Sequence, residues 1–205
     1  VYADSSEDEL LQMMNFIKKR KDEQMMGGTG GGDRQKNKNL ARQAAKYLRK
    51  SDGPRVAVFE VNGFDTHAAQ GGVDGTHTKC LVEMDEIINN LRDNLQEAYK
   101  DTIILTVTEF GRTIKQNGGN GTEHGYGTAI FMAGGLLKKS QVHTDWPGLK
   151  RKEMYEGRDL NATIDARSVY ASAMTTVFDL DFKRIQKDVF WGEDLQNLSD
   201  KLFKV

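Results

Sequence analysis

The stretch Val56-Ala57-Val58-Phe59-Glu60-Val61 is a short, nearly continuous apolar run that is rich in β-branched residues. A second run, Ile103-Ile104-Leu105-Thr106-Val107-Thr108, has the same character. Such runs are typical of strands covered on both faces, as in a largely parallel sheet. Between them, residues 78–99 repeat apolar side chains at helical spacing. We therefore predict adjacent parallel strands at 56–61 and 102–108, joined through this helix by a right-handed crossover.

Further elements extend this β-α-β unit. A third apolar run spans residues 128–133 and ends at a pair of glycines, and residues 166–178 predict a last packed helix with Asp165 near its start. Residues 39–50 predict another helix. Together these elements predict an α/β fold, a three-layer sandwich with a largely parallel, mixed sheet between helices.

The first fifty residues differ from the rest. Acidic residues at 7–9 precede an apolar stripe over residues 10–17, which predicts a helix. We interpret the glycine-rich stretch at 27–38 as a flexible linker, because a phosphate-binding loop would need a preceding strand and a Lys-Ser/Thr pair at its end. We therefore divide the chain into a helical N-terminal segment, 1–50, and an α/β domain, 51–205.

Composition limits what the chain is expected to be. The chain has 205 residues, enough for one core-forming domain, with 29 Lys and Arg against 30 Asp and Glu. This balance gives no reason to expect nucleic acid or a membrane surface as partner. No run of about 18 apolar residues is present, so we expect no membrane span. Cys80 is the only cysteine, so an internal disulfide cannot form.

Acids and histidines follow or precede the predicted strands. Asp65 and His67 come after the first run, and Glu109 comes after the second. Glu123 and His124 precede the third run, whose start lies at the same edge if that strand is antiparallel to the others. Carboxylates gathered at one edge repel each other unless a cation holds them, and a mixed imidazole and carboxylate set suits zinc or manganese. The alternative is that these are separate capping and loop residues that never meet.

Four motifs in this region make the sequence recognisable. They are, in order, Gly63-Phe-Asp-Thr-His67, Thr108-Glu-Phe-Gly-Arg-Thr113, Gly121-Thr-Glu-His-Gly125, and Gly157-Arg-Asp-Leu160 with Thr163-Ile-Asp-Ala-Arg167. They resemble the bacterial domain-of-unknown-function family 1501, whose usual forms read GWDTH, SEFGRT, GTDHG and TTDxR. The resemblance covers roughly residues 40–181. Departures such as Phe64 for Trp and Glu123 for Asp are mild.

That family is in turn similar to the alkaline phosphatase and sulfatase superfamily, which implies an alkaline-phosphatase-like fold. By this resemblance, a divalent metal, zinc ahead of manganese or calcium, would be bound by Asp65, His67, Glu109 and His124. Glu123 and Arg112 would bind or position the substrate, although an anionic ligand and a surface ion pair are equal alternatives for Arg112. The family resemblance also implies a bacterial protein exported to the periplasm.

These resemblances imply a metal-dependent hydrolase-like domain that acts on small-molecule phosphate or sulfate esters. Superfamily enzymes carry a nucleophilic Ser, Thr or modified Cys after a strand that precedes the metal-binding motifs, whereas nothing strand-like precedes Val56. The catalytic residue is therefore unknown. We expect either that this chain is the C-terminal part of a larger domain, completed by an N-terminal remainder of the same protein, or that it is a non-catalytic binding or assembly subunit that keeps the fold, with or without a structural metal.

Overall fold

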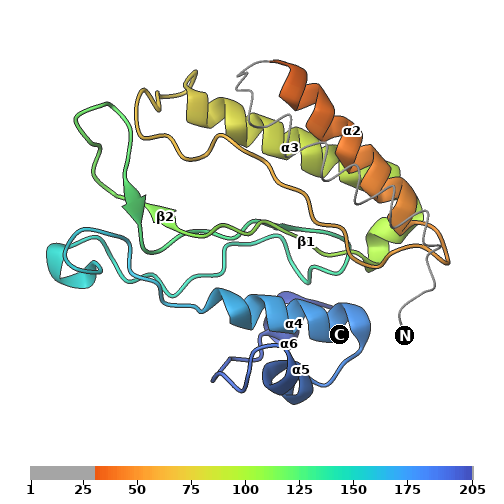
Figure 1. Ribbon diagram of the computed structural model, residues 1–205. Coiled ribbons are helices and arrows are strands. Elements are labelled where there is room, and N and C mark those ends of the chain that lie inside the picture. Colours follow the sequence, from red (N-terminus) through yellow and green to blue (C-terminus); the bar gives the residue numbers. More distant parts are fainter. Residues whose placement is uncertain (1–30, 205) are drawn as a thin grey trace.

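The computed structural model describes residues 31–204, in which extended segments run between two groups of helices (Figure 1). The first group is α2 (Gly31–Leu48) and α3 (Thr76–Leu95), followed by the 3₁₀ helix η1 (Gln96–Asp101). The second is α4 (Ala166–Phe178), α5 (Phe182–Asp188) and α6 (Ser199–Leu202); the 3₁₀ helix η2 (Arg151–Glu153) lies apart. The strands are β1 (Ile104–Leu105), β2 (Gly111–Arg112), β3 (His124–Gly125) and β4 (Met132–Ala133). None of the helices in this range is long and apolar enough to cross a membrane.

The predicted three-layer sandwich with a largely parallel sheet is wrong. Within residues 31–204 the strands form two separate two-stranded sheets, β1 with β4 and β2 with β3, and both are antiparallel. Residues 56–61 form no strand, and no backbone hydrogen bond joins them to residues 102–108. The third apolar run is indeed antiparallel to the second, because Ile104 pairs with Ala133 and Leu105 with Met132.

The first apolar run has the composition of a strand but forms no ladder with another segment of residues 31–204. Phe59 and Val61 pack against the core between α2 and α3, whereas Val56 and Val58 are 61% and 91% exposed. The run is therefore covered on one side only. An apolar, β-branched composition indicates that a segment is suited to a sheet. Whether its backbone pairs depends on a second segment elsewhere in the chain, which the composition of the first segment does not specify.

Helices α2 and α3 pack closely because α2 presents small residues to α3. Ala41 and Ala45 are fully buried, one helical turn apart, against Ile87, Leu91 and Leu95 of α3. Helix α2 covers most of the helix predicted at 39–50, ending at Leu48, but it begins at Gly31, so residues 31–38 are helical and do not form a linker. The rest of the glycine stretch and the helix predicted after residue 7 lie outside the described residues. The division of the chain at residue 50 stays a prediction.

Strand β1 lies between the two helical groups and contacts both. Ile104 packs against the core of α2 and α3, while Ile103 and Leu105 pack against a second core built on α4 and α6. This alternation is that of an extended segment with side chains on opposite faces. The chain leaving β1 is thereby fixed on both sides, and it leads directly to β2 and the candidate site.

Two helices predicted from the sequence are confirmed. Helix α3 covers most of residues 78–99, and α4 coincides with residues 166–178. Asp165 caps α4, and its side chain accepts a hydrogen bond from the backbone N–H of Arg167 at 2.8 Å. Buried serines of α4 then hold the C-terminal segment: Ser168 Oγ accepts from Gln196 N at 2.9 Å and Ser172 Oγ from Leu198 N at 2.8 Å.

Candidate metal centre

Two of the sequence motifs pair with each other as a β-hairpin. Strand β2 belongs to the second motif and β3 to the third, and the register places Gly111 opposite Gly125 and Arg112 opposite His124. A Cβ on Gly125 would lie 2.5 Å from the carbonyl carbon of Arg112, so only glycine allows this close approach. The hairpin thus fixes His124 next to Arg112.

The loop of this hairpin docks on the first motif. The backbone N–H groups of Ala69 and Gln70 donate to the carbonyls of Gly119 and Asn120, both at 2.9 Å, and Thr122 N donates to Thr66 O at 3.1 Å. These bonds join the segment that carries Asp65 and His67 to the hairpin that carries His124. The first three motifs therefore form one local structure.

Asn117 organises the loop and was not predicted as a site residue. Its Oδ1 accepts hydrogen bonds from Gly119 N and Gly121 N, each at 2.9 Å, and its Nδ2 donates to the carbonyl of His67 at 2.8 Å. A Cβ on Gly121 would lie 2.3 Å from the carbonyl carbon of His67. The sequence did carry a signal for this role, because Asn followed by glycines is typical of a turn in which the side chain replaces a backbone acceptor.

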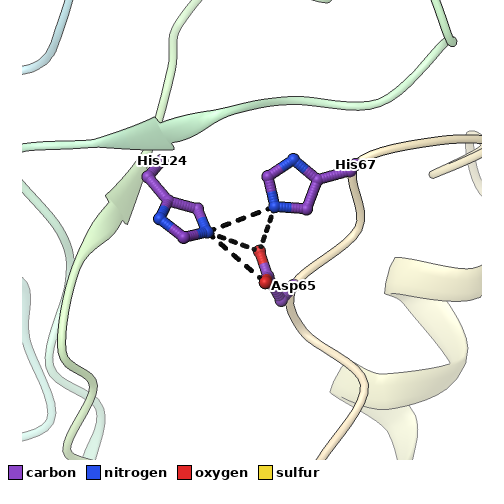
Figure 2. A group of neighbouring side chains, drawn as sticks. All are labelled: Asp65, His67 and His124. Atoms are coloured by element: carbon purple, nitrogen blue, oxygen red, sulfur yellow. Dashed lines mark hydrogen bonds and ion pairs between the residues drawn. The ribbon is translucent and has the colours of Figure 1, made fainter.

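Asp65, His67 and His124 converge, as Figure 2 shows. His67 Nε2 lies 3.0 Å from Asp65 Oδ1 and 3.2 Å from His124 Nε2, and His124 Nε2 lies 3.2 Å from Asp65 Oδ1. Asp65 and His67 come from one loop, and His124 comes from β3. We call these three residues the triad. The alternative that the motif residues never meet is thereby excluded for these three.

The spacing within the triad fits a tetrahedral metal site. Two ligands of a tetrahedral zinc ion, each about 2.0–2.1 Å from it, lie about 3.3–3.4 Å from each other. The three donor-to-donor distances in the triad are 3.0, 3.2 and 3.2 Å, so a small adjustment would seat one ion between them. About half of each side chain is exposed (51% for Asp65, 44% for His67, 51% for His124), which leaves one side of the site open to solvent.

Glu123 sets the orientation of His67. Its Oε2 lies 2.8 Å from His67 Nδ1, and Asn117 donates to its other oxygen. Hydrogen bonds from Asn117 and then from His67 hold the pKa of Glu123 below its usual range, so it is an ionised acceptor at neutral pH. A carboxylate at Nδ1 places the proton of a neutral imidazole there and turns the Nε2 lone pair toward the triad. This is the arrangement that carboxylates provide behind metal-binding histidines.

The Arg112 side chain forms an ion pair with Asp65 of the triad. Its guanidinium donates to Asp65 Oδ1 and, through Nε, to Thr122 Oγ1 at 2.9 Å. Partial desolvation acts to raise the pKa of Asp65, but the hydrogen bonds with Arg112 and His124 outweigh it, and the pKa lies below its ordinary value. Asp65 is therefore ionised at neutral pH and can act as a ligand. A direct role for Arg112 in substrate binding stays a prediction.

Glu109, the fourth predicted ligand, does not join the triad. Its side chain is exposed, and no hydrogen bond or ion pair between the described residues connects it to Asp65, His67 or His124. The next residue, Phe110, contacts the site: its ring stacks on the ring of His124, with centroids 3.8 Å apart and an interplanar angle of 15°. The role of Glu109 stays a prediction, whereas Phe110 supports His124 by packing.

The two acids of the fourth motif, Asp159 and Asp165, each pair with an arginine of the same motif. Asp159 is buried and accepts from Arg158 Nε at 2.9 Å and Nη2 at 2.6 Å. Asp165 pairs with Arg167, whose hydrogen bonds hold the pKa of Asp165 below its usual range. Among the described side chains, the group that could hold a metal ion consists of the triad and does not include Asp159 or Asp165. This part of the sequence pattern fixes turns and the start of α4.

Comparison with known proteins identifies the family. No curated protein and no solved structure matches the chain. The family model described as "Protein of unknown function (DUF1501)" matches residues 5–188, a range that includes the triad and all four motifs. The chain therefore belongs to the DUF1501 family.

Proposed function

We propose that this chain carries the metal site of a hydrolase that acts on phosphate or sulfate esters. The observation that carries the proposal is the convergence of Asp65, His67 and His124 at the distances of a tetrahedral site. The ester substrate class is supported by the resemblance of the motifs to the alkaline phosphatase and sulfatase superfamily. The fold gives no support to that relationship, because the described residues lack the parallel sheet.

The donor set fits a divalent ion of the zinc type. Two imidazoles and one carboxylate are the ligands found in catalytic zinc sites that keep a further position for water or substrate. Asp65 Oδ1 and His67 Nε2 lie 3.0 Å apart. When His67 is neutral with its proton on Nδ1, neither its Nε2 nor the ionised Asp65 carries a proton that could form a hydrogen bond between them. Two acceptors this close are stabilised by a cation. Zinc is our first choice, with manganese and calcium as alternatives.

Each residue around the site has a defined part in this proposal. When bound, the ion would polarise an ester oxygen and offset the negative charge that develops during hydrolysis. Asp65, His67 and His124 would hold it, and their open side would admit the anionic ester. Glu123, at Nδ1 of His67, would keep the imidazole proton on that nitrogen, and the hydrogen bond from Arg112 helps to keep Asp65 ionised.

One observation favours a second candidate, a non-catalytic binding or assembly subunit. Among residues 31–204, the side chains that contact the side chains of the triad by hydrogen bond, ion pair or ring stacking are Arg112, Glu123 and Phe110. Within residues 31–204 no Ser, Thr or Cys side chain makes such a contact with the triad, so no nucleophile of the kind used by the superfamily lies beside it. The two candidates share the metal site and differ only in turnover.

The first experiment measures metal and turnover in the same purified chain. We expect about one zinc ion per chain after loading, lost in His124→Ala and retained in His143→Ala, a histidine outside the triad. Hydrolysis of 4-nitrophenyl phosphate and 4-nitrophenyl sulfate should likewise be lost in His124→Ala and retained in His143→Ala. Equal zinc content in wild type and His124→Ala contradicts the metal site. Zinc binding without turnover of either ester contradicts the hydrolase and leaves the binding subunit.

A further inference from the structure

An exposed pair of aromatic rings includes Tyr126, which follows His124 of the triad by two residues. Tyr126 and Tyr155 stack with ring centroids 3.9 Å apart and an interplanar angle of 16°. Both remain accessible, with 51% of Tyr126 and 38% of Tyr155 exposed. Each ring covers one face of the other, so the outer faces and edges are what solvent reaches. We call this pair the tyrosine stack.

The position of the tyrosine stack relative to the triad is limited by covalent geometry. Tyr126 follows His124 by two residues, and two residues of extended chain span at most about 7 Å. The limit applies to the Cα atoms of His124 and Tyr126, so the stack is carried by the segment next to the triad. A ligand whose anionic group is held at the triad can therefore extend toward Tyr126.

Backbone hydrogen bonds hold both tyrosines in place. Tyr155 N donates to Asp159 O at 2.9 Å, and Asp159 N donates to Tyr155 O at 3.0 Å, which closes a tight turn. The buried Asp159 carboxylate accepts from Arg158 and anchors this turn. Gly127 N donates to Leu160 O at 2.8 Å, so the residue after Tyr126 is tied to the residue after Asp159, the backbone partner of Tyr155. The stack is thus fixed before any ligand arrives, which lowers the entropic cost of binding to it.

We propose that the tyrosine stack binds the sugar ring of a sugar phosphate or sugar sulfate whose ester group is held at the triad; this inference rests on the proposed function. A tyrosine face offers a flat apolar surface with a polar hydroxyl at its edge. A sugar ring can lay its C–H face on such a surface and keep its hydroxyl groups in water. The half-exposed stack suits that ligand better than an aryl ring, which would favour an enclosed apolar pocket.

The test compares esters that share the anionic group and differ in the ring. Affinities of the zinc-loaded full chain for glucose 6-phosphate, glycerol 3-phosphate and phenyl phosphate are measured by calorimetry, and the corresponding sulfates are run in parallel. We expect Tyr126→Ala and Tyr155→Ala to weaken binding of the glucose ester about five- to tenfold and to leave the glycerol ester unchanged. Tyr126→Phe, which keeps the ring, should retain most of the affinity.

Tyr47→Ala serves as the matched control, because Tyr47 is 49% exposed on α2 and belongs to neither site. Equal losses for the glucose and glycerol esters, or no loss for the glucose ester, overturn the inference. A loss confined to phenyl phosphate overturns the choice of a sugar. The test distinguishes this inference from the proposed function. If the chain shows the expected affinities but hydrolyses no ester, only the proposed hydrolase activity is contradicted. If it hydrolyses esters but shows no preference for the sugar ring, only the proposed role of the tyrosine stack is contradicted.

Discussion

At the scale of single residues, the contact between Glu123 and His67 decides which imidazole nitrogen faces the other ligands. The carboxylate lies at Nδ1, and Nε2 is turned toward Asp65 and His124. Asn117 holds Glu123 from the other side and also binds the backbone of His67. Glu123 is therefore a positioning residue, and its effect on a metal should pass entirely through His67.

Substitution of Glu123 tests this assignment. Loss of a carboxylate behind a metal-binding histidine typically lowers metal affinity about 10- to 100-fold, and we expect this range for Glu123→Ala. Glu123→Gln should recover part of the loss, because its amide oxygen can still accept from Nδ1. The dissociation constant for zinc is measured by competition with a coloured chelator, with circular dichroism as the check on folding. Unchanged affinity in a folded Glu123→Ala protein would contradict the role.

At the scale of elements, the contact between α2 and α3 combines small apolar residues with an ion-pair cluster. Arg34 Nε donates to Glu86 Oε2 at 2.7 Å, and Lys38 Nζ lies 2.8 Å from the same oxygen. Hydrogen bonds from Arg34 and then from Lys38 lower the pKa of Glu86 from 4.5 to about 2. The carboxylate thus binds protons less readily in the folded chain than in the unfolded one.

This shift gives the packing of α2 on α3 a defined pH dependence. Because the pKa is lower in the folded state, Glu86 contributes stability that is fully present above pH 4.5 and is lost as the pH falls from about 4.5 through about 2. Thermal unfolding followed between pH 7 and pH 2 should show a smaller decline in Glu86→Gln than in wild type. Added salt should also reduce the wild-type advantage, since the cluster is near the surface.

Asp85→Asn provides the control for this measurement, because Asp85 is the neighbouring acid on α3 and its side chain bonds only Asn89 among the described residues. It should keep the wild-type pH profile. If Glu86→Gln and wild type decline in parallel through the acid range, the ion-pair cluster does not couple the two helices.

At the scale of the whole molecule, the triad joins segments that are distant in sequence. His67 and His124 are 57 positions apart, and only the docked hairpin loop brings them together. An ion shared by both would bind the folded chain and not the unfolded one. Metal binding should therefore raise the stability of the entire structure.

The expected size of this effect follows from mass action. Zinc at a hundred times its dissociation constant should stabilise the fold by about 2.7 kcal/mol, and for a chain of this length that corresponds to a rise in melting temperature of about 5–10 °C. Differential scanning calorimetry should show the rise, and a chelator should reverse it. His67→Ala should abolish the effect and His143→Ala should keep it. An equal rise in His67→Ala would mean that zinc acts elsewhere.

The sequence determined the features that depend on local signals. Helices α3 and α4 follow from apolar spacing, and the cap at Asp165 follows from its position before α4. Asp65, His67 and His124 were identified because they lie in short motifs between apolar runs. Glu109 satisfied the same criterion yet lies outside the triad, since a motif gives the residue type but not the direction of the side chain.

Only the tertiary structure decided which segments pair. Residues 56–61 have a strand's composition, but sheet formation requires a second backbone within hydrogen-bonding distance, and that partner is set by packing far away in sequence. The same reason explains why the β2–β3 hairpin, the contact between Glu123 and His67, and the stack of Tyr126 on Tyr155 could not be predicted. Each is a contact between chain segments whose relative position depends on the free energy of the whole fold, which no single stretch of sequence contains.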